Sequence, residues 1–315
     1  MNTMSTFSIR HYVPEKDLHN LHLMLTEIES IDHDGEDTSE EYLLASLQWV
    51  NYRPAQDVWV AEADGKLVGY GVALEQPSQR CTIYFVVHPS RRRQGLGSQL
   101  LELTLNRARE VGSISILVYA NGHNEASNIF LQHHGFQQVG SSGSLKAPAA
   151  VNVPAPEFPV GFTLRKYSEV NEPHTLLHAL NMCYQGMWGH QHNDNPSEEE
   201  LKSPRFLNYY SAEDILLLYS EKNEVVGICS LKSEGKKDGN GEVSDLLDGP
   251  GILQEYRDKG YQRQMMLAGI QHLRRHHTHP ITLEFWGESE SALNSYRKLG
   301  FEMVNHYIAY HKELK

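Results

Sequence analysis

The hydrophobic positions of the first 140 residues change repeatedly between two periods, and this predicts alternating strands and helices. Apolar and polar residues alternate over residues 7–12, which is typical of a half-buried strand. Leucine and isoleucine recur every three or four positions over residues 15–29, which predicts an amphipathic helix. The same criteria predict strands at Val58–Ala63, Lys66–Leu74, Thr82–Val87, Ser115–Ala120 and Phe136–Val139, and helices at Gly97–Val111 and Glu125–His134.

The second half of the chain repeats this order of elements. Val87–Gly97 lies upstream of Gly135-Phe136, and Ile252–Gln262 lies at the same spacing upstream of Gly300-Phe301. Two copies of about 150 residues are domains rather than solenoid repeats. We therefore predict a first domain over residues 1–145, an extended linker over 146–160 and a second domain over 161–315. Its elements are predicted as strands at Phe162–Tyr167, Glu242–Leu246, Ile281–Phe285 and Phe301–Tyr310, a hairpin over Ile215–Leu231, and helices at Pro173–Met187, Tyr261–His276 and Ser289–Leu299.

Composition narrows the class of protein. With 315 residues, of which 40% are hydrophobic and 22% charged, the chain can bury two cores of ordinary size. It contains no apolar run of membrane-spanning length and no signal-peptide pattern. Three widely spaced cysteines, Cys81, Cys183 and Cys229, favour a reducing compartment and are expected to be small buried residues. We expect a cytoplasmic protein.

The net charge of −12 bears on partners. It argues against nucleic acid, whose binding needs a basic surface, and mildly favours a cationic substrate. His276, His277 and His279 end a predicted helix, where favourable contacts with the helix dipole explain them more simply than a metal does. No metal, nucleic acid or membrane is therefore expected as a partner.

The turn between the strand at Thr82–Val87 and the next helix is suited to bind phosphate. A helix N-terminus presents unpaired N–H groups and a partial positive charge, and anionic phosphates bind there if the backbone can approach closely. Gly95 and Gly97 leave that approach open, and Arg91, Arg92 and Arg93 add positive charge. A dinucleotide fingerprint fits less well because its third glycine position holds Leu100, and a nucleotide triphosphate loop lacks its Gly-Lys-Ser/Thr ending.

The segment Val87-x-Pro89-x-x-Arg92-x-x-Gly95-x-Gly97 resembles the acyl-CoA pyrophosphate loop of the GNAT superfamily of N-acetyltransferases. A second GNAT signature is matched by Asn124-x-x-Ser127-x-x-Phe130 followed by Gly135-Phe136. The resemblance covers both halves. It implies an α/β (α+β) fold of two tandem GNAT-like domains, each with a mixed, mostly antiparallel central sheet flanked by helices, as in tandem enzymes of the mycothiol synthase type.

The resemblance also implies where acetyl-CoA binds. Backbone groups of Phe85, Val86 and Val87 are expected to hold the pantetheine arm like an added strand. The pyrophosphate is expected on the N–H groups of residues 92–98, and the lower part of CoA along the following helix. The implied cofactor-binding residues of the loop and helix are Arg92, Arg93, Gln94, Gly95, Leu96, Gly97, Ser98, Asn124, Ser127 and Phe130.

Each half departs from the family pattern in a different place. In the first half, Leu131 stands where many members carry a general-acid tyrosine, and the strand before the loop offers no carboxylate. The second half carries Tyr296 at the tyrosine position, but Gln254 and Gln262 replace the proline and the second glycine of its loop. Acetyl-CoA binding in the second half is therefore in question.

Acetyl transfer to an amine requires removal of a proton, which costs about 4–5 kcal/mol at pH 7 for a group with a pKa near 10.4. The resemblance suggests Glu242 as the base and Tyr296 as the acid that protonates the leaving thiolate. The alternative is that Tyr296 is a core aromatic residue and Glu242 an exposed end of a hairpin. Residues 188–194 occupy the position of a GNAT acceptor loop, and an ordinary polar loop is the competing interpretation.

Three functional hypotheses follow. The favoured one is an acetyl-CoA-dependent N-acetyltransferase that acts on a small amine by direct transfer in a ternary complex, as a monomer or homodimer, with catalysis in one half. A second enzyme hypothesis places catalysis in the first half, whose loop is intact and whose acidic segment, residues 27–37, could supply a base through water. The third is a non-catalytic CoA-binding or regulatory protein.

Overall fold

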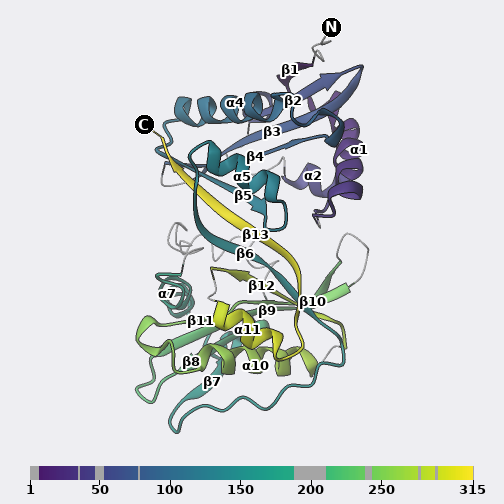
Figure 1. Cartoon of the computed structure of the whole chain (residues 1–315). Helices are drawn as coiled ribbons and strands as arrows, with labels where there is room; N and C mark the ends of the chain where they lie inside the picture. The colour runs from purple at the N-terminus through teal and green to yellow at the C-terminus, as the bar shows by residue number, and fades with distance from the viewer. Residues whose placement is uncertain are drawn as a thin grey trace. The chain divides into compact units, whose positions relative to one another are not determined.

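The computed structural model describes residues 7–34, 36–46, 53–76, 79–187, 211–237, 243–275, 278–287 and 290–314. The chain forms two compact units (Figure 1). Unit 1 comprises residues 1–139 and 308–315, and unit 2 comprises residues 140–307. Unit 1 is thus completed by the end of the chain. This exchange was not foreseen from the sequence pattern.

Unit 1 is built on a mostly antiparallel sheet with strand order β1-β2-β3-β4-β5-β13. β4 and β5 pair in parallel over the first half of β4. The elements are β1 (Ser8–His11), α1 (Pro14–Asp32), α2 (Glu40–Ser46), α3 (Pro54–Asp57), β2 (Val58–Ala63), β3 (Lys66–Gln76), β4 (Arg80–Val87), the short 3-10 helix η1 (Pro89–Arg91), α4 (Leu96–Glu110), β5 (Ser115–Asn121), α5 (Glu125–His133) and the end of β13 (Glu302–Glu313).

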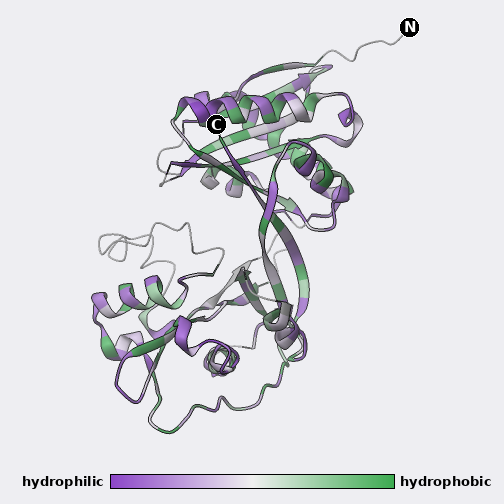
Figure 2. Ribbon diagram, turned by 60° about the vertical axis from the view of Figure 1, so that its left-hand side comes forward, coloured by the Kyte–Doolittle hydropathy of each residue, from purple (hydrophilic) through white to green (hydrophobic). Residues whose placement is uncertain are grey.

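The two faces of this sheet are covered by different helices. Leu96, Leu100 and Leu101 of α4 pack with one core cluster, while Leu21 and Ile28 of α1 pack with a second one. The buried leucines of α4 recur at helical spacing, and Glu102, Asn106 and Arg109 are exposed; Figure 2 shows such a division as green and purple along the helix. The sequence pattern therefore explains why these two helices enclose the sheet.

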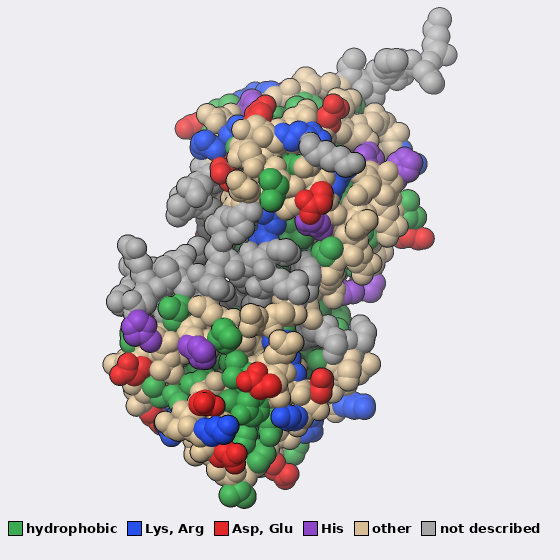
Figure 3. Space-filling view, turned by 90° about the vertical axis from the view of Figure 1, so that its left-hand side faces the viewer, with side chains coloured by type: hydrophobic (Ala, Val, Ile, Leu, Met, Phe, Trp, Pro, Cys, Tyr) green, Lys and Arg blue, Asp and Glu red, His purple; other side chains and the backbone are tan. Residues whose placement is uncertain are grey.

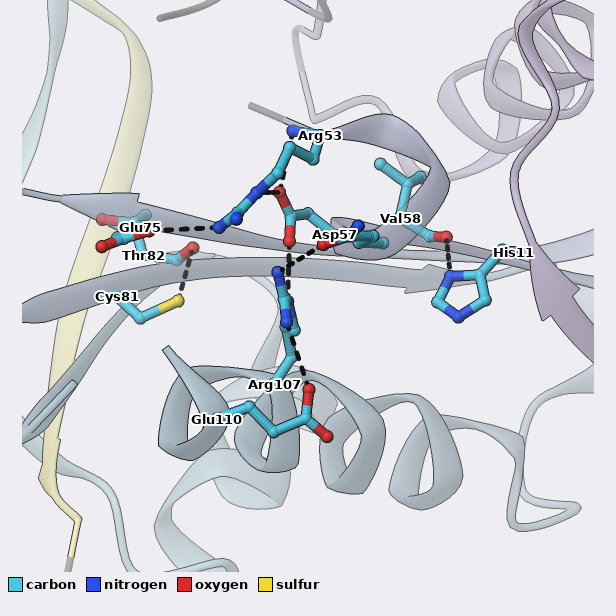
Figure 4. A network of polar contacts seen from close by, with 10 residues as sticks. His11, Arg53, Asp57, Val58, Glu75, Cys81, Thr82, Arg107 and Glu110 are labelled. Carbon is cyan, nitrogen blue, oxygen red and sulfur yellow. Dashed lines mark hydrogen bonds and ion pairs between the residues drawn. The ribbon is translucent and has the colours of Figure 1, made fainter. Parts of the chain in front are cut away.

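A buried ion pair fixes α4 against the start of β2. Arg107 on α4 donates from Nε to Asp57 Oδ1 at 2.7 Å, and the backbone N–H of Arg53 donates to Asp57 Oδ2 at 2.8 Å (Figure 4). Glu110 and Glu75 complete the network, through Arg107 and Arg53 respectively. Nearby, burial raises the pKa of the Cys81 thiol to about 12, so this cysteine is an inert core residue.

Unit 2 has strand order β13-β6-β12-β10-β9-β8-β7, with β11 paired to β9. It repeats the parallel pairing at matching positions, because Asp245–Asp248 of β10 pair with Ile281–Glu284 of β12. The elements are β6 (Gln137–Ala147), β7 (Thr163–Lys166), α6 (Tyr167–Val170), α7 (Pro173–Cys183), the 3-10 helix η3 (Ala212–Asp214), β8 (Ile215–Tyr219), β9 (Val225–Lys237), β10 (Val243–Asp248), β11 (Gly251–Ile252), the 3-10 helix η4 (Gln254–Tyr256), α10 (Tyr261–Arg274), β12 (Ile281–Trp286), α11 (Glu290–Arg297) and β13.

Residues 148–162, within and beyond the expected linker, pack onto unit 2. Val151, Val153, Phe158 and Phe162 lie against its core.

On the face that Figure 3 shows, acidic and basic side chains are interspersed. The described helices include none that is both long and apolar enough to cross a membrane.

Candidate active site

The turn between β4 and α4 presents backbone N–H groups at a helix end. Gly95 precedes the helix in the left-handed conformation, with φ of 85°, and Arg93 also has a positive φ of 62°. The first helical hydrogen bond runs from the Gln99 N–H to the Gly95 carbonyl over 3.2 Å. The N–H groups of Leu96, Gly97 and Ser98 therefore project from the helix end, as an anion site requires.

The three arginines of the turn make different contacts. Arg92 donates from Nε to the Val87 carbonyl at 2.9 Å and from Nη1 to Asp32 at 2.9 Å, so its side chain ties the end of α1 to the end of β4. Its own N–H donates to the Pro89 carbonyl at 3.3 Å. Arg91 pairs with Asp64. Arg93 is exposed and has no ion pair within the described residues, which makes it the arginine best placed to reach a phosphate.

The second half of β4 has an open edge. Its parallel pairing with β5 ends at Ile83 and Val118, while its pairing with β3 continues to Val87. The His88 N–H donates to Val68 of the β3 side at 3.0 Å, and polar groups alternate along a strand. The backbone groups of Val86 thus face β3, whereas those of Phe85 and Val87 face the open edge. An added strand would bind to Phe85 and Val87.

Helix α5 supplies the other predicted cofactor residues. Asn124 caps the helix by accepting the Ser127 N–H at 3.1 Å. The Phe130 ring lies 5.9 Å from the Phe85 ring, centroid to centroid. A Cβ atom at Gly97 would lie 3.9 Å from Phe130, so the start of α4 and the side of α5 approach each other closely. The structure thus brings the loop, the open edge and α5 together.

A cavity of about 250 Å³ opens on the α1 side of β3 and β4. Its walls are largely apolar, and four carboxylates lie among the residues around it. The apolar and aromatic lining residues are Leu25, Ile28, Tyr42, Leu43, Tyr70, Val72, Leu74, Tyr84 and Val86, and the acidic ones are Glu29, Asp34, Glu36 and Asp37. Because Val86 is the neighbour of Phe85 and Val87, the cavity adjoins the open edge of β4.

Asp34 is the most chemically distinctive of these carboxylates. Burial raises its pKa above the ordinary range, and the nearby Asp32 and Glu29 raise it further. Arg92 and a hydrogen bond from Asn121, the last residue of β5, act in the opposite direction. A carboxyl group with a raised pKa is a better proton acceptor than an exposed one. Asp34 was not a predicted catalytic residue, although it lies within the acidic segment noted in the sequence.

The cavity also contains hydroxyl groups that no sequence motif indicates. Leu131, at the position of the family's tyrosine, is buried in the core and offers none. Tyr70 and Tyr84 lie side by side in the cavity wall with ring centroids 6.0 Å apart. The alternation of side chains along β3 and β4 could have predicted this, because it places Tyr70, Tyr84 and Val86 on the face of the sheet that α1 covers.

The second half repeats the framework of the turn. Gly260 has φ of 80°, and the Gln264 N–H donates to its carbonyl at 3.2 Å. Arg257 donates from Nε to the Ile252 carbonyl at 2.9 Å, which matches the contact between Arg92 and Val87. The guanidinium also donates to the backbone carbonyls of Cys183 and Gln185. The arginine contact that the two halves share is therefore a structural brace within unit 2.

The ligand-facing groups of the second half differ from those of the first. Pro250 stands at the position of Phe85, so the N–H that faced the open edge is absent. Asp258 stands at the position of Arg93 and has a similar φ of 60°. Tyr184 donates to the Gly249 carbonyl at 3.1 Å, and its ring lies against Gly251, the counterpart of Val86. The space beside this strand is therefore filled by a tyrosine ring.

Aromatic residues surround the start of α10. The Phe162 ring lies 5.3 Å from the Tyr261 ring and 6.1 Å from the Tyr256 ring. The Glu157 N–H donates to the Gln264 side chain at 2.9 Å. Residues 157–162 thus lie beside the turn whose counterpart in unit 1 is exposed.

The remaining predicted residues are placed as follows. Tyr296 is 1% exposed and belongs to the apolar core of unit 2, which favours the packing alternative. Glu242, residues 188–194, His276 and His277 lie outside the described residues. His279 contacts Asp245 at 3.3 Å. No cluster of three or more potential metal ligands occurs in the described part of the chain.

Comparisons with known proteins agree with this geometry. The sequence model of the Acetyltransferase (GNAT) family matches residues 22–136 and 174–301. The chain therefore belongs to the GNAT acetyltransferase family and is an N-acetyltransferase with two GNAT domains in tandem. GNAT acetyltransferases use acetyl-CoA as the acyl donor.

Relatives and solved structures share the tandem architecture. The chain is 27% identical over 291 residues to a mycothiol acetyltransferase of Renibacterium salmoninarum, covering 89% of this chain and 82% of the relative. It is 25% identical over 259 residues to one of Paenarthrobacter aurescens, covering 81% and 77%. A GCN5-related N-acetyltransferase from Sphaerobacter thermophilus has the same fold, with a TM-score of 0.75, 20% identity and coverage of 98% and 95%. A tandem GNAT protein from the clavulanic acid biosynthesis pathway gives a TM-score of 0.65 at 14% identity, with 98% coverage of both chains.

Proposed function

We propose that the first half binds acetyl-CoA and transfers its acetyl group to a primary amine held in the cavity between α1 and β4. The observation that carries this proposal is the adjacency of three parts within unit 1. They are an exposed helix end at residues 93–98, an open strand edge at Phe85 and Val87, and an acid-rimmed cavity lined by Val86.

The donor would be held mainly by backbone groups. The pyrophosphate lies on the N–H groups of residues 93–98, with Arg93 adding charge, and the pantetheine arm follows Phe85 and Val87. Since the side chain of Arg92 is held by Asp32 and Val87, it shapes the turn rather than contacting phosphate.

The acceptor amine would lose its proton to Asp34, directly or through water. The neutral nitrogen then attacks the thioester carbonyl carbon, the C–S bond breaks, and the CoA thiolate leaves and takes up a proton. This assigns the chemistry to the second of the two enzyme hypotheses, in place of Glu242 and Tyr296.

Three observations support a different role for the second half. Pro250 cannot donate a hydrogen bond to a pantetheine arm, Asp258 would repel phosphate, and the Tyr184 ring fills the counterpart of the cavity. In this proposal, unit 2 does not bind acetyl-CoA.

Matched glycine variants test the proposal. Gly95 and Gly260 have nearly the same φ and no atom within 4 Å of an added Cβ, so glutamate strains both positions similarly. Gly95→Glu places a carboxylate at the phosphate site and should abolish measurable acetyl-CoA binding and thiol release. Gly260→Glu should leave the acetyl-CoA affinity and the rate of thiol release within about twofold of those of the unaltered protein.

The same pair of variants can contradict the proposal. Loss of activity in Gly260→Glu, with activity retained in Gly95→Glu, would place catalysis in the second half. Thermal unfolding of both variants shows whether either fails to fold.

A further inference from the structure

We infer that the acceptor is a small primary amine with a single cationic end and an apolar, preferably aromatic, body. This inference rests on the proposed function and adds the class of substrate. It distinguishes such amines from polyamines and from amino sugars, whose polar groups are distributed along the whole molecule.

The interior of the cavity is suited to an apolar body. Leu25 and Ile28 of α1 face Val72 and Leu74 of β3 across it, and Leu43 of α2 adds a further apolar side chain. These five residues offer no hydrogen bonds to a sugar hydroxyl or to an internal amine of a polyamine. The hydroxyl groups of Thr38 and Ser46, which also line the cavity, already bond to the Thr26 hydroxyl and to the Leu43 carbonyl. Burying such a polar group without a partner is unfavourable, whereas burying one methylene group improves binding about fourfold.

The charged residues define the cationic end. Four carboxylates and no lysine or arginine are among the described residues that line the cavity. Two of the carboxylates accept hydrogen bonds from amides of the loop that follows α1, because Glu29 of α1 accepts the Glu36 N–H at 3.3 Å and Asp37 accepts the Ser39 N–H at 3.0 Å. An ammonium group that approaches this loop is attracted before Asp34 takes its proton.

The size of the cavity limits the length of the acceptor. Its volume of about 250 Å³ lies below the range of roughly 300–1,000 Å³ that is usual for pockets of drug-sized ligands. The tyrosine rings of Tyr70 and Tyr84 in its wall can pack against a flat aromatic group. A phenylalkylamine therefore matches the space and the charge together.

An amine panel with saturating acetyl-CoA tests this inference. The panel contains ethylamine, 2-phenylethylamine, tryptamine, spermidine and glucosamine, and the readout is kcat/KM from thiol release. We expect 2-phenylethylamine to exceed ethylamine by about 100-fold, from the apolar area buried. It should exceed spermidine and glucosamine by at least about tenfold.

A filling variant locates the effect in the cavity. Leu74 is half-buried and lines the cavity. Leu74→Trp should therefore lower kcat/KM for 2-phenylethylamine at least tenfold, and it should leave kcat/KM for ethylamine within about twofold of that of the unaltered enzyme. Leu44→Trp is the control, because Leu44 is 46% exposed and does not line the cavity. It should leave both amines unchanged.

The outcomes separate this inference from the proposed function. If spermidine or glucosamine is the better substrate, or Leu74→Trp affects all amines equally, the acceptor class is wrong. In that case, acetyl-CoA binding that is lost in Gly95→Glu would still support catalysis in the first half. If Gly95→Glu retains full activity, the proposed function itself fails.

Discussion

The two halves have the same turn, before α4 in unit 1 and before α10 in unit 2, yet they use it differently. In both, an arginine Nε donates to the carbonyl of the last strand residue over 2.9 Å, and a glycine in the left-handed conformation begins the helix. In unit 1 the neighbouring positions hold Arg93 and Phe85, and in unit 2 they hold Asp258 and Pro250. The residues that build the turn are thus shared, while those that would face a ligand are not. A matching sequence motif therefore indicates the fold of a turn before it indicates binding.

The largest effect is expected from the proposed base. Asp34→Asn should lower kcat by about 10²–10⁴-fold, the usual range for losing a general base. Because the pKa of Asp34 is raised, activity of the unaltered enzyme should fall as the pH drops through a value above that of an ordinary aspartate. The variant should lack that acidic limb in its pH–rate profile.

Tyr296→Phe is the matched comparison for this prediction. Its kcat should remain within about twofold, because Tyr296 is buried in the core of unit 2. A loss of kcat in Tyr296→Phe with full activity in Asp34→Asn would restore the second-half hypothesis.

A smaller effect, on acetyl-CoA affinity, is expected when Phe85 at the open edge of unit 1 is replaced by proline, the residue at the matching position of unit 2. Phe85→Pro removes one N–H donor and the ring that contacts Phe130. The expected loss of acetyl-CoA affinity is about 30-fold, for one hydrogen bond and one aromatic pair. Titration calorimetry measures it. Phe85→Leu keeps the N–H and should recover most of the affinity, and equal losses in the two variants would contradict a role for that donor.

Reversing the charge at position 93 should lower the affinity for acetyl-CoA by about tenfold. Arg93→Asp copies Asp258 and replaces one charge-assisted hydrogen bond to phosphate by repulsion, an effect that salt partly screens. The KM for acetyl-CoA should rise at low salt, and the difference from the unaltered enzyme should shrink at high salt. A KM that is unchanged at low salt would show that Arg93 does not contact the donor.

The smallest effect concerns the strand that completes unit 1. Tyr310 of β13 is buried and donates to Asn128 on α5 at 3.0 Å. Tyr310→Phe removes this hydrogen bond and should cost about 1 kcal/mol in the free energy of unfolding. Urea denaturation measures this loss. Because α5 lines the donor site, the KM for acetyl-CoA should rise with little change in kcat, and an unchanged KM would limit Tyr310 to a role in stability.

Much of the fold could be predicted from the sequence because periodicity reports burial directly. Helix α4 was predicted at Gly97–Val111 and lies at Leu96–Glu110, and the strand predicted at Thr82–Val87 is the core of β4. Periodicity does not identify which strands pair with one another. Alternation at residues 301–310 shows that a strand forms, but not that residues 308–315 belong to unit 1.

The candidate site was predicted only in part. The loop glycines and the open edge follow a local motif, so sequence could locate them. The cavity is formed by α1, α2, β3 and β4, and no local pattern reports the space that remains between them. Likewise, the sequence presents Asp34 as one acidic residue among several, and only the fold shows that its burial and the nearby Asp32 and Glu29 raise its pKa.

The most direct test of the account is the number of acetyl-CoA molecules bound by each chain. Titration calorimetry should give one site per chain in the unaltered protein, one in Gly260→Glu and none in Gly95→Glu. Two sites per chain, or one site that persists in Gly95→Glu and disappears in Gly260→Glu, would contradict the assignment of acetyl-CoA binding to the first half alone.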